Sequence, residues 1–334
     1  MGFPWFRNTI TKTRESICYF KINNKIHFEM KFLKLNDGRI ILYNEKTAIK
    51  IYRILNNKIS LELVFNIDYG NENKGPYIIY KIDKDIVLIG TSDLILIDLK
   101  RNIKILQKIN INNTHKDYHI LKLSSGLIAI HFSNKIIIFN YDKKIKKLVK
   151  KDELDIQDLS ELSVKELSEI NNENILVSSG SFAYILNLKT KEIKEIKNME
   201  INKNCINCIY RKIILIENYR FIYYLNKVGE KYIGYLDIYR IDLEGIKFLQ
   251  TINLNHPYIM KQIIKLNGNK LIGNDDKGNI YEFNIDDNFH ISLKDIFKGS
   301  DEGKVEDDIN IYKYSDNKII SFGSGSIIKI LEFD

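Results

Sequence analysis

The sequence of 334 residues is poor in the residues that cross-link a fold or interrupt it. It contains 3 cysteines, 3 prolines and 17 glycines. Three cysteines are too few for the disulfide framework of a secreted domain, so a reducing compartment is favoured and the cytoplasm is the expected location. The scarcity of proline and glycine excludes an extended linker rich in either residue.

Long apolar runs are also absent. The longest uncharged ones, such as Ile136 to Phe139, have the length of a strand. A helix that crosses a bilayer needs about 20 apolar residues, so no transmembrane segment is expected. The first residues lack the basic start, the apolar core and the small-residue cleavage site of a secretory signal.

The charge is positive but mixed. Lysine and arginine number 51 against 43 aspartates and glutamates, which gives a net charge of +8. The two signs are interspersed along the chain, so the excess is interpreted as solvated surface. Nucleic-acid binding is kept as an alternative that this charge does not favour.

What the sequence has in abundance is a repeated strand pattern. Apolar stretches with period-2 alternation, separated by Asn, Asp and Gly turns, recur about every 40 residues, four strands to a unit. This pattern predicts β-propeller blades, whose fold does not by itself name a chemistry. The clearest copy has strands at Met30–Leu35, Arg39–Tyr43, Ala48–Ile54 and Ile59–Phe65.

The number of units and the two chain ends predict how the ring closes. We count seven units, of which the last is one strand short, and a spare strand at Ser16–Ile22 precedes the first. Open sheet edges promote aggregation, so this strand is expected to complete the last blade beside Ile327–Phe333. The prediction is an all-β, seven-bladed propeller of four-stranded antiparallel blades, and six or eight blades would follow from a different division of unit five or the termini. Residues 16–334 then form one domain, preceded by a segment of residues 1–15.

Several hairpins resemble a known family. Leu271 to Phe283 (Leu-Ile-Gly-Asn-Asp-Asp-Lys-Gly-Asn-Ile-Tyr-Glu-Phe) is similar to the second and third strands of a WD40 repeat, and Val87–Leu99, Ile175–Leu188 and Ile319–Leu331 are similar. The Gly-His and Trp-Asp dipeptides of that family are missing, and the single tryptophan is Trp5. Its buried Asp-His-Ser/Trp network therefore cannot be carried over. The resemblance implies a degenerate WD40-like propeller, a rigid platform for protein complexes that usually lacks catalysis.

Motifs for chemistry are scarce. Cys205 and Cys208 have the spacing of half a zinc site, but the sequence has no second cysteine pair. Neither Gly-x-Ser-x-Gly nor a phosphate-binding loop occurs. We therefore assign no catalytic residue, no cofactor and no metal site. A propeller enzyme, or a small-ligand binder that uses the central channel, stays open as an alternative.

Two features suggest binding of other proteins. The first is a basic cluster around the last strand of unit three, followed by an acidic stretch in which Asp152–Leu167 is expected to form a short helix. The second is an aromatic group within residues 1–15, which could dock onto a partner or a membrane interface or fold back to cover the surface of the propeller. The candidate partner-binding residues are Phe3, Trp5, Phe6, Lys143, Lys144, Lys146, Lys147, Lys150 and Lys151. The sequence thus favours a non-catalytic scaffold for protein–protein interaction, in a larger complex with partners of unknown identity.

Overall fold

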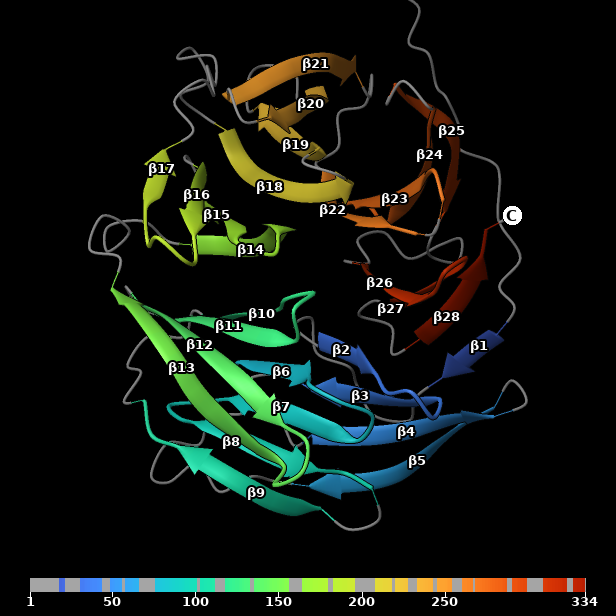
Figure 1. Ribbon diagram of the computed structural model, residues 1–334. Helices are drawn as coiled ribbons and strands as arrows, with labels where there is room; N and C mark the ends of the chain where they lie inside the picture. Colours follow the sequence, from blue (N-terminus) through green and yellow to red (C-terminus); the bar gives the residue numbers. More distant parts are fainter. Residues whose placement is uncertain are drawn as a thin grey trace, which may run out of the picture.

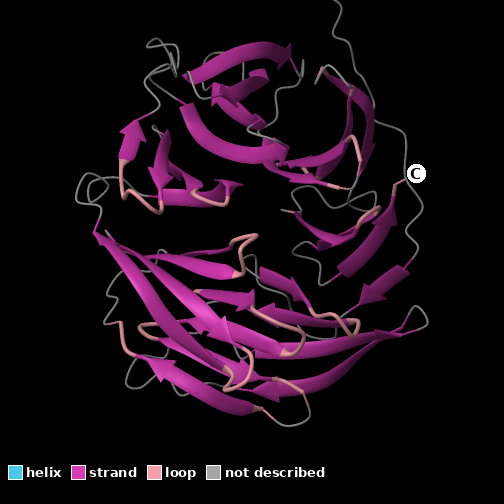
Figure 2. Ribbon diagram, viewed as in Figure 1, coloured by secondary structure: helices cyan, strands magenta, loops and turns pink. Residues whose placement is uncertain are grey.

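The strands of the computed structural model are arranged as the blades of a propeller (Figure 1). In the part of the chain that the structure describes, only strands and loops occur (Figure 2). The described residues are 18–21, 31–43, 49–55, 58–65, 76–100, 103–111, 118–132, 135–155, 164–179, 183–195, 208–217, 220–227, 233–242, 245–253, 260–266, 268–286, 290–298, 309–322 and 327–333.

These residues form seven four-stranded sheets, which we call blades and number along the chain. In each of the first six blades, sequential strands pair in order. The first three blades contain β2 (Lys31–Lys34), β3 (Arg39–Tyr43), β4 (Ile49–Leu55) and β5 (Lys58–Phe65); β6 (Ile78–Lys81), β7 (Ile86–Gly90), β8 (Leu94–Asp98) and β9 (Lys104–Ile109); and β10 (Tyr118–Lys122), β11 (Leu127–Phe132), β12 (Lys135–Asp142) and β13 (Lys147–Asp155).

The next three blades repeat this arrangement. They contain β14 (Val164–Asn171), β15 (Asn174–Ser179), β16 (Ala183–Asn187) and β17 (Ile193–Glu195); β18 (Cys208–Glu217), β19 (Arg220–Lys227), β20 (Ile233–Asp242) and β21 (Gly245–Asn253); and β22 (Met260–Lys265), β23 (Lys270–Asp275), β24 (Asn279–Ile285) and β25 (Ile291–Lys298).

The last blade joins the two ends of the chain. It holds β26 (Asn310–Ser315), β27 (Lys318–Phe322) and β28 (Ile327–Glu332), and its fourth strand is β1 (Cys18–Lys21). β1 pairs antiparallel with β28, with Cys18 opposite Ile330 and Lys21 opposite Ile327. Figure 1 shows the two strands side by side. The predicted all-β propeller of four-stranded antiparallel blades, closed by an N-terminal strand, is confirmed.

The hydrophobic core lies between the blades. Successive side chains of a strand point to opposite faces, so the middle strands of a blade face a neighbouring blade on each side. In β7, Val87 and Ile89 pack against the first blade, whereas Ile86 and Leu88 pack against the third. All five residues of β7 are therefore buried. This explains why the middle strands read as continuous apolar runs rather than as strict alternation.

One prediction about the acidic stretch is wrong. The expected helix over Asp152–Leu167 fails at both ends, because Asp152–Asp155 belong to β13 and Val164–Leu167 belong to β14. Residues 156–163 lie outside the described residues. Leu154 and Leu167, which the helix prediction placed on one side together with Leu159 and Leu162, are buried with Val164 between the third and fourth blades. The apolar spacing therefore reflects two strands that line the same interblade core.

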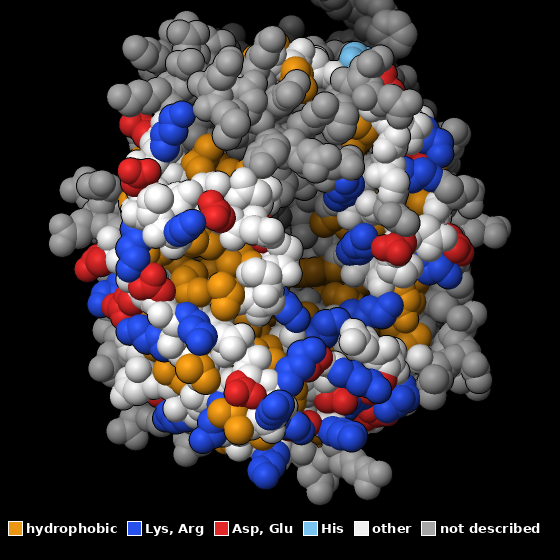
Figure 3. Space-filling view, in the orientation of Figure 1, with side chains coloured by type: hydrophobic (Ala, Val, Ile, Leu, Met, Phe, Trp, Pro, Cys, Tyr) orange, Lys and Arg blue, Asp and Glu red, His pale blue; other side chains and the backbone are white. Residues whose placement is uncertain are grey.

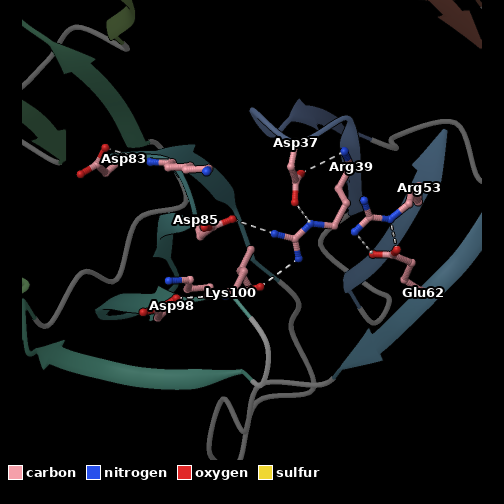
Figure 4. Close-up of polar contacts among 10 residues, drawn as sticks. Asp37, Arg39, Arg53, Glu62, Asp83, Asp85, Asp98 and Lys100 are labelled. Atoms are coloured by element: carbon pink, nitrogen blue, oxygen red, sulfur yellow. Dashed lines mark hydrogen bonds and ion pairs between the residues drawn. The ribbon is translucent and has the colours of Figure 1, made fainter. Parts of the chain in front are cut away.

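A buried arginine joins the first two blades (Figure 4). The Arg39 guanidinium donates Nε–H to Asp37 Oδ2 at 2.6 Å within its own turn. It also donates to Asp85 Oδ1 at 2.8 Å and to the Leu99 carbonyl at 2.9 Å, both on the second blade. The Arg39 side chain is 8% exposed, so these bonds replace the water that the charge loses on folding.

We expect Arg39→Met to lower the free energy of unfolding by about 3 kcal/mol, because it leaves the partly buried carboxylates of Asp37 and Asp85 without their cation. Arg53→Met is the matched control, since Arg53 lies opposite Arg39 on β4 and pairs with Glu62 near the surface. Its effect should stay within about 1 kcal/mol. Urea unfolding followed by circular dichroism measures both, and equal effects would contradict the assignment.

Candidate partner-binding surfaces

The predicted basic cluster lies on the outside of the third blade. Lys143 and Lys144 are in the turn between β12 and β13, and Lys147 and Lys151 are on β13, the outermost strand. All four are exposed. The pairing of β12 with β13 shifts register between Ile138 and Phe139, so Lys151 is the extra residue of a β-bulge. The structure therefore brings these lysines together at one edge of the ring.

Two lysines of the cluster bind nearby carboxylates instead. Lys146 has a positive φ of 51° in the turn, and its ammonium lies 2.6 Å from Asp98 Oδ2 on the second blade. Lys150 pairs with Glu153 on the same strand. These two residues thus hold the turn and the strand in place, and they are less available to a partner than the other four.

The acidic neighbours of the cluster are also engaged. Asp152 accepts a hydrogen bond from Lys191 of the fourth blade at 2.8 Å, and this bond holds the pKa of Asp152 below its usual value. Glu153 accepts from Lys135 at 2.8 Å as well as from Lys150, and these bonds likewise lower its pKa. Both carboxylates are already paired, so they compensate the remaining lysines only in part.

Apolar side chains within the cluster are what sequence reasoning missed. Ile145 is 58% exposed and Val149 is 41% exposed, and both lie among the exposed lysines. The sequence does contain a signal for this surface, because Ile145 is an apolar residue within a lysine-rich turn. We name the set the outer basic patch; it comprises Lys143, Lys144, Ile145, Lys147, Val149 and Lys151.

The other predicted contact residues are Phe3, Trp5 and Phe6. They lie outside the described residues, so the aromatic segment stays a prediction. Further exposed apolar side chains occur on the outer strand of the first blade, where Leu61 and Val64 on β5 are 49% and 48% exposed. Exposed apolar side chains therefore occur on the outer strands of more than one blade.

A propeller enzyme would need titratable side chains that the fold itself does not use, so we consider the partners of the buried carboxylates. Asp275 is the last residue of β23 and accepts four hydrogen bonds within its own hairpin. The donors are the Lys277 and Asn279 amides, the Asn279 side chain and the Tyr281 hydroxyl, at 2.6 to 2.9 Å. Burial nevertheless raises the pKa of Asp275, against the effect of these donors. Gly278 has a φ of 73° in this turn, which favours glycine. The hydrogen bonds to Asp275 therefore stabilise the hairpin of β23 and β24.

Two further sets of titratable side chains lie within single blades. Glu282 is buried on β24, and its carboxylate lies 2.9 Å from the Lys294 ammonium. His119 and His131 face each other across β10 and β11 with ring centroids 5.9 Å apart. Among the described residues, no group of three histidine, cysteine, aspartate or glutamate side chains has the arrangement of a metal site. Cys205 and His115 lie outside those residues.

We expect Asp275→Asn to change the pH dependence of stability with a defined sign. Burial raises the folded pKa of Asp275 above its unfolded value of about 3.9, so the folded state binds more protons between these two values. Lowering the pH from about 7 to about 4 should therefore stabilise the wild type relative to the variant, which lacks this group. Urea unfolding of both proteins at each pH measures the difference. A relative loss for the wild type would refute the raised pKa.

Comparison with known proteins identifies the fold. No family model and no curated protein matches the sequence. Within the residues described, no helix has the length and apolar character needed to cross a membrane. Among solved structures, a virginiamycin B lyase from Staphylococcus aureus is similar with a TM-score of 0.61 and 14% identity, over 95% of this chain and 98% of that one.

Two further solved structures are similar over nearly their whole length. The β-propeller domain of Cps50 (Swd1) from Myceliophteria thermophila has a TM-score of 0.62 and 12% identity, over 94% of this chain and 99% of that one. The N-terminal domain of Nup159 has a TM-score of 0.58 and 8% identity, over 96% and 95%. At such identities the likeness concerns the fold alone, and that fold is the β-propeller.

Proposed function

We propose that the protein is a non-catalytic scaffold that holds other proteins in a larger assembly, built on a ring of seven blades. The observation that carries this proposal is the outer basic patch, where exposed lysines surround Ile145 and Val149. Exposed apolar side chains rimmed by charge are typical of surfaces that another protein covers. The propeller supplies a rigid frame that fixes the position of this patch.

The chemistry of the patch favours a protein partner over a nucleic acid. Lysines alone would suit the phosphate groups of a nucleic acid. Contacts between lysines and phosphates are also what makes nucleic-acid affinity fall as the salt concentration rises. Single-stranded nucleic acid is also bound by aromatic rings on which bases stack. The apolar members of the patch are aliphatic, and they can be buried against an apolar surface but cannot stack with bases. An acidic protein surface with an apolar centre is the better match.

The catalytic alternative lacks a comparable observation. The solved structures of similar fold include a lyase, so the fold does not decide the question. The buried carboxylates Asp275 and Glu282 bind donors from their own blades, which accounts for both without a substrate. We further propose that residues 1–15, with Phe3, Trp5 and Phe6, form a second contact outside the propeller domain of residues 16–334, and that the protein acts in the cytoplasm.

The proposal is tested by affinity purification from the native source, with quantitative mass spectrometry of the wild type and two variants. We expect a partner protein in stoichiometric amount with the wild type. Ile145→Ser/Val149→Ser should reduce it about tenfold, because an apolar contact of two residues is lost. Ile105→Ser is the matched control, since Ile105 is as exposed as Ile145, at 58%, on β9 of the second blade.

A second variant, Phe3→Ser/Trp5→Ser/Phe6→Ser, examines the N-terminal segment in the same purification. Circular dichroism establishes that each variant is folded. Folded wild-type protein that carries no stoichiometric partner would overturn the scaffold. Full partner recovery with the Ile145→Ser/Val149→Ser variant would overturn the role of the outer basic patch.

A further inference from the structure

A lysine occurs at the same place on the first strand of five blades. In four blades it is the last residue of the strand, and in the last blade it lies two residues before the strand ends. A buried or half-buried residue follows it in each case. The backbone amides of Leu35, Ile82, Leu123 and Leu266 close four of the turns into the second strand with hydrogen bonds of 2.8 to 3.1 Å. The five lysines are Lys34, Lys81, Lys122, Lys265 and Lys313.

Strand register shows that the five positions are equivalent. In all five blades the lysine lies opposite the second residue of the following strand: Ile40, Val87, Ile128, Leu271 and Ile319. The first strands are the innermost of each blade in Figure 1. Those of the first and second, second and third, and sixth and last blades approach within 8 Å between Cα atoms. The lysines therefore occupy one level of the ring, around its centre.

Three of these lysines donate hydrogen bonds to the preceding blade. Lys34 Nζ donates to the Tyr314 carbonyl at 2.7 Å and lies 4.0 Å from the centroid of the Tyr314 ring. Lys81 Nζ donates to Asn36 Oδ1 at 2.7 Å, and Lys122 Nζ donates to the Ile82 carbonyl at 2.9 Å. An ammonium has three N–H donors, so each contact fixes the charge in place and leaves it able to bind an anion.

The positive charges act on one another. Burial lowers the pKa of Lys34, and the neighbouring charge of Lys81 lowers it further. Burial likewise lowers the pKa of Lys81, with a further contribution from Lys122. Like charges that are held together at a fixed spacing favour an anion, because the anion relieves their repulsion. Figure 3 shows lysine and arginine side chains beside the central hollow, over the region of β2, β3 and β6 in Figure 1.

Acidic residues limit this positive arc without removing it. In the fourth blade, Glu169 occupies the lysine position and accepts hydrogen bonds from the Ser124 amide and hydroxyl. Asp316 pairs with Lys313 at 3.2 Å. In the turns of the first two blades, Asp37 and Asp85 bind Arg39, while Asp83 accepts from the Lys84 amide. The arc thus runs from the sixth blade through the last and first to the third, and ends at Glu169.

We propose that this arc, which we call the lysine rim, binds an extended acidic segment of a partner protein. The inference rests on the proposed scaffold function and names the chemistry of one partner. An extended chain rises about 3.3 Å per residue, so alternate side chains are about 6.6 Å apart. A segment with a carboxylate at every second residue therefore presents a row of negative charges along one side, which can face the lysines of successive blades. A compact anion would contact fewer blades.

The test uses the full chain and a fluorescein-labelled peptide of six Glu-Ser repeats, with fluorescence anisotropy as the readout. We expect Lys34→Gln/Lys81→Gln/Lys122→Gln to weaken binding at least about tenfold, because charged pairs are lost while glutamine can still donate to the same turns. Lys104→Gln/Lys189→Gln/Lys194→Gln is the matched control. It removes the same charge from exposed outer positions and should bind as the wild type does.

The outcomes separate this inference from the scaffold proposal. Equal loss in both triple variants would show that only net charge matters and would overturn the lysine rim. Tight binding of sodium tripolyphosphate to the wild type, lost in the rim variant, with no binding of the peptide, would assign the rim to a small polyanion and overturn the acidic segment. Retention of the native partner by a rim variant that no longer binds the peptide would leave the scaffold intact and remove the rim from that contact. Urea unfolding establishes that both variants are folded.

Discussion

The pairing of β1 with β28 is the interaction on which the rest of the structure depends. The second blade buries apolar side chains on both faces, against the first blade on one side and the third on the other, so a blade of this kind needs a neighbour on either side. An open ring would leave the edge of β28 unpaired and would loosen the cores on both sides of the last blade. The four-residue strand Cys18–Lys21 prevents this, since its pairing joins the two ends of the chain. The outer basic patch and the lysine rim keep fixed positions only in a closed ring.

Both proposed surfaces arise from the same geometry. A blade exposes its innermost strand toward the centre and its outermost strand toward solvent, while the two middle strands are buried. Polar and charged residues are therefore tolerated at two places. One is the end of the first strand, where Lys34 and Lys81 reach the preceding blade. The other is the last strand, where Lys147 and Val149 remain exposed. A propeller thus offers separate inner and outer contacts to its partners.

Much of the fold could be predicted from the sequence, because strands, turns and closure are local or pairwise patterns. The Asp152–Leu167 helix was the failure, since apolar spacing alone does not distinguish a helix from two strands that share one core. The contact of Lys146 with Asp98 could not be predicted, because it joins neighbouring blades across 48 residues. The lysine rim did have a signal, in that Leu-Lys-Leu, Tyr-Lys-Ile and Ile-Lys-Leu each precede a turn at Lys34, Lys81 and Lys265. Only an alignment of the units by register makes these positions equivalent.

Amide hydrogen exchange of β28 tests the closed ring most directly. Residues Ile327–Glu332 pair with β27 on one side and with β1 on the other. Exchange is compared by mass spectrometry in the full chain, in a variant that lacks residues 1–15 and in one that lacks residues 1–21. Closure predicts full protection of β28 without residues 1–15 and a marked loss of protection without residues 1–21. Equal protection in all three proteins would contradict closure by β1.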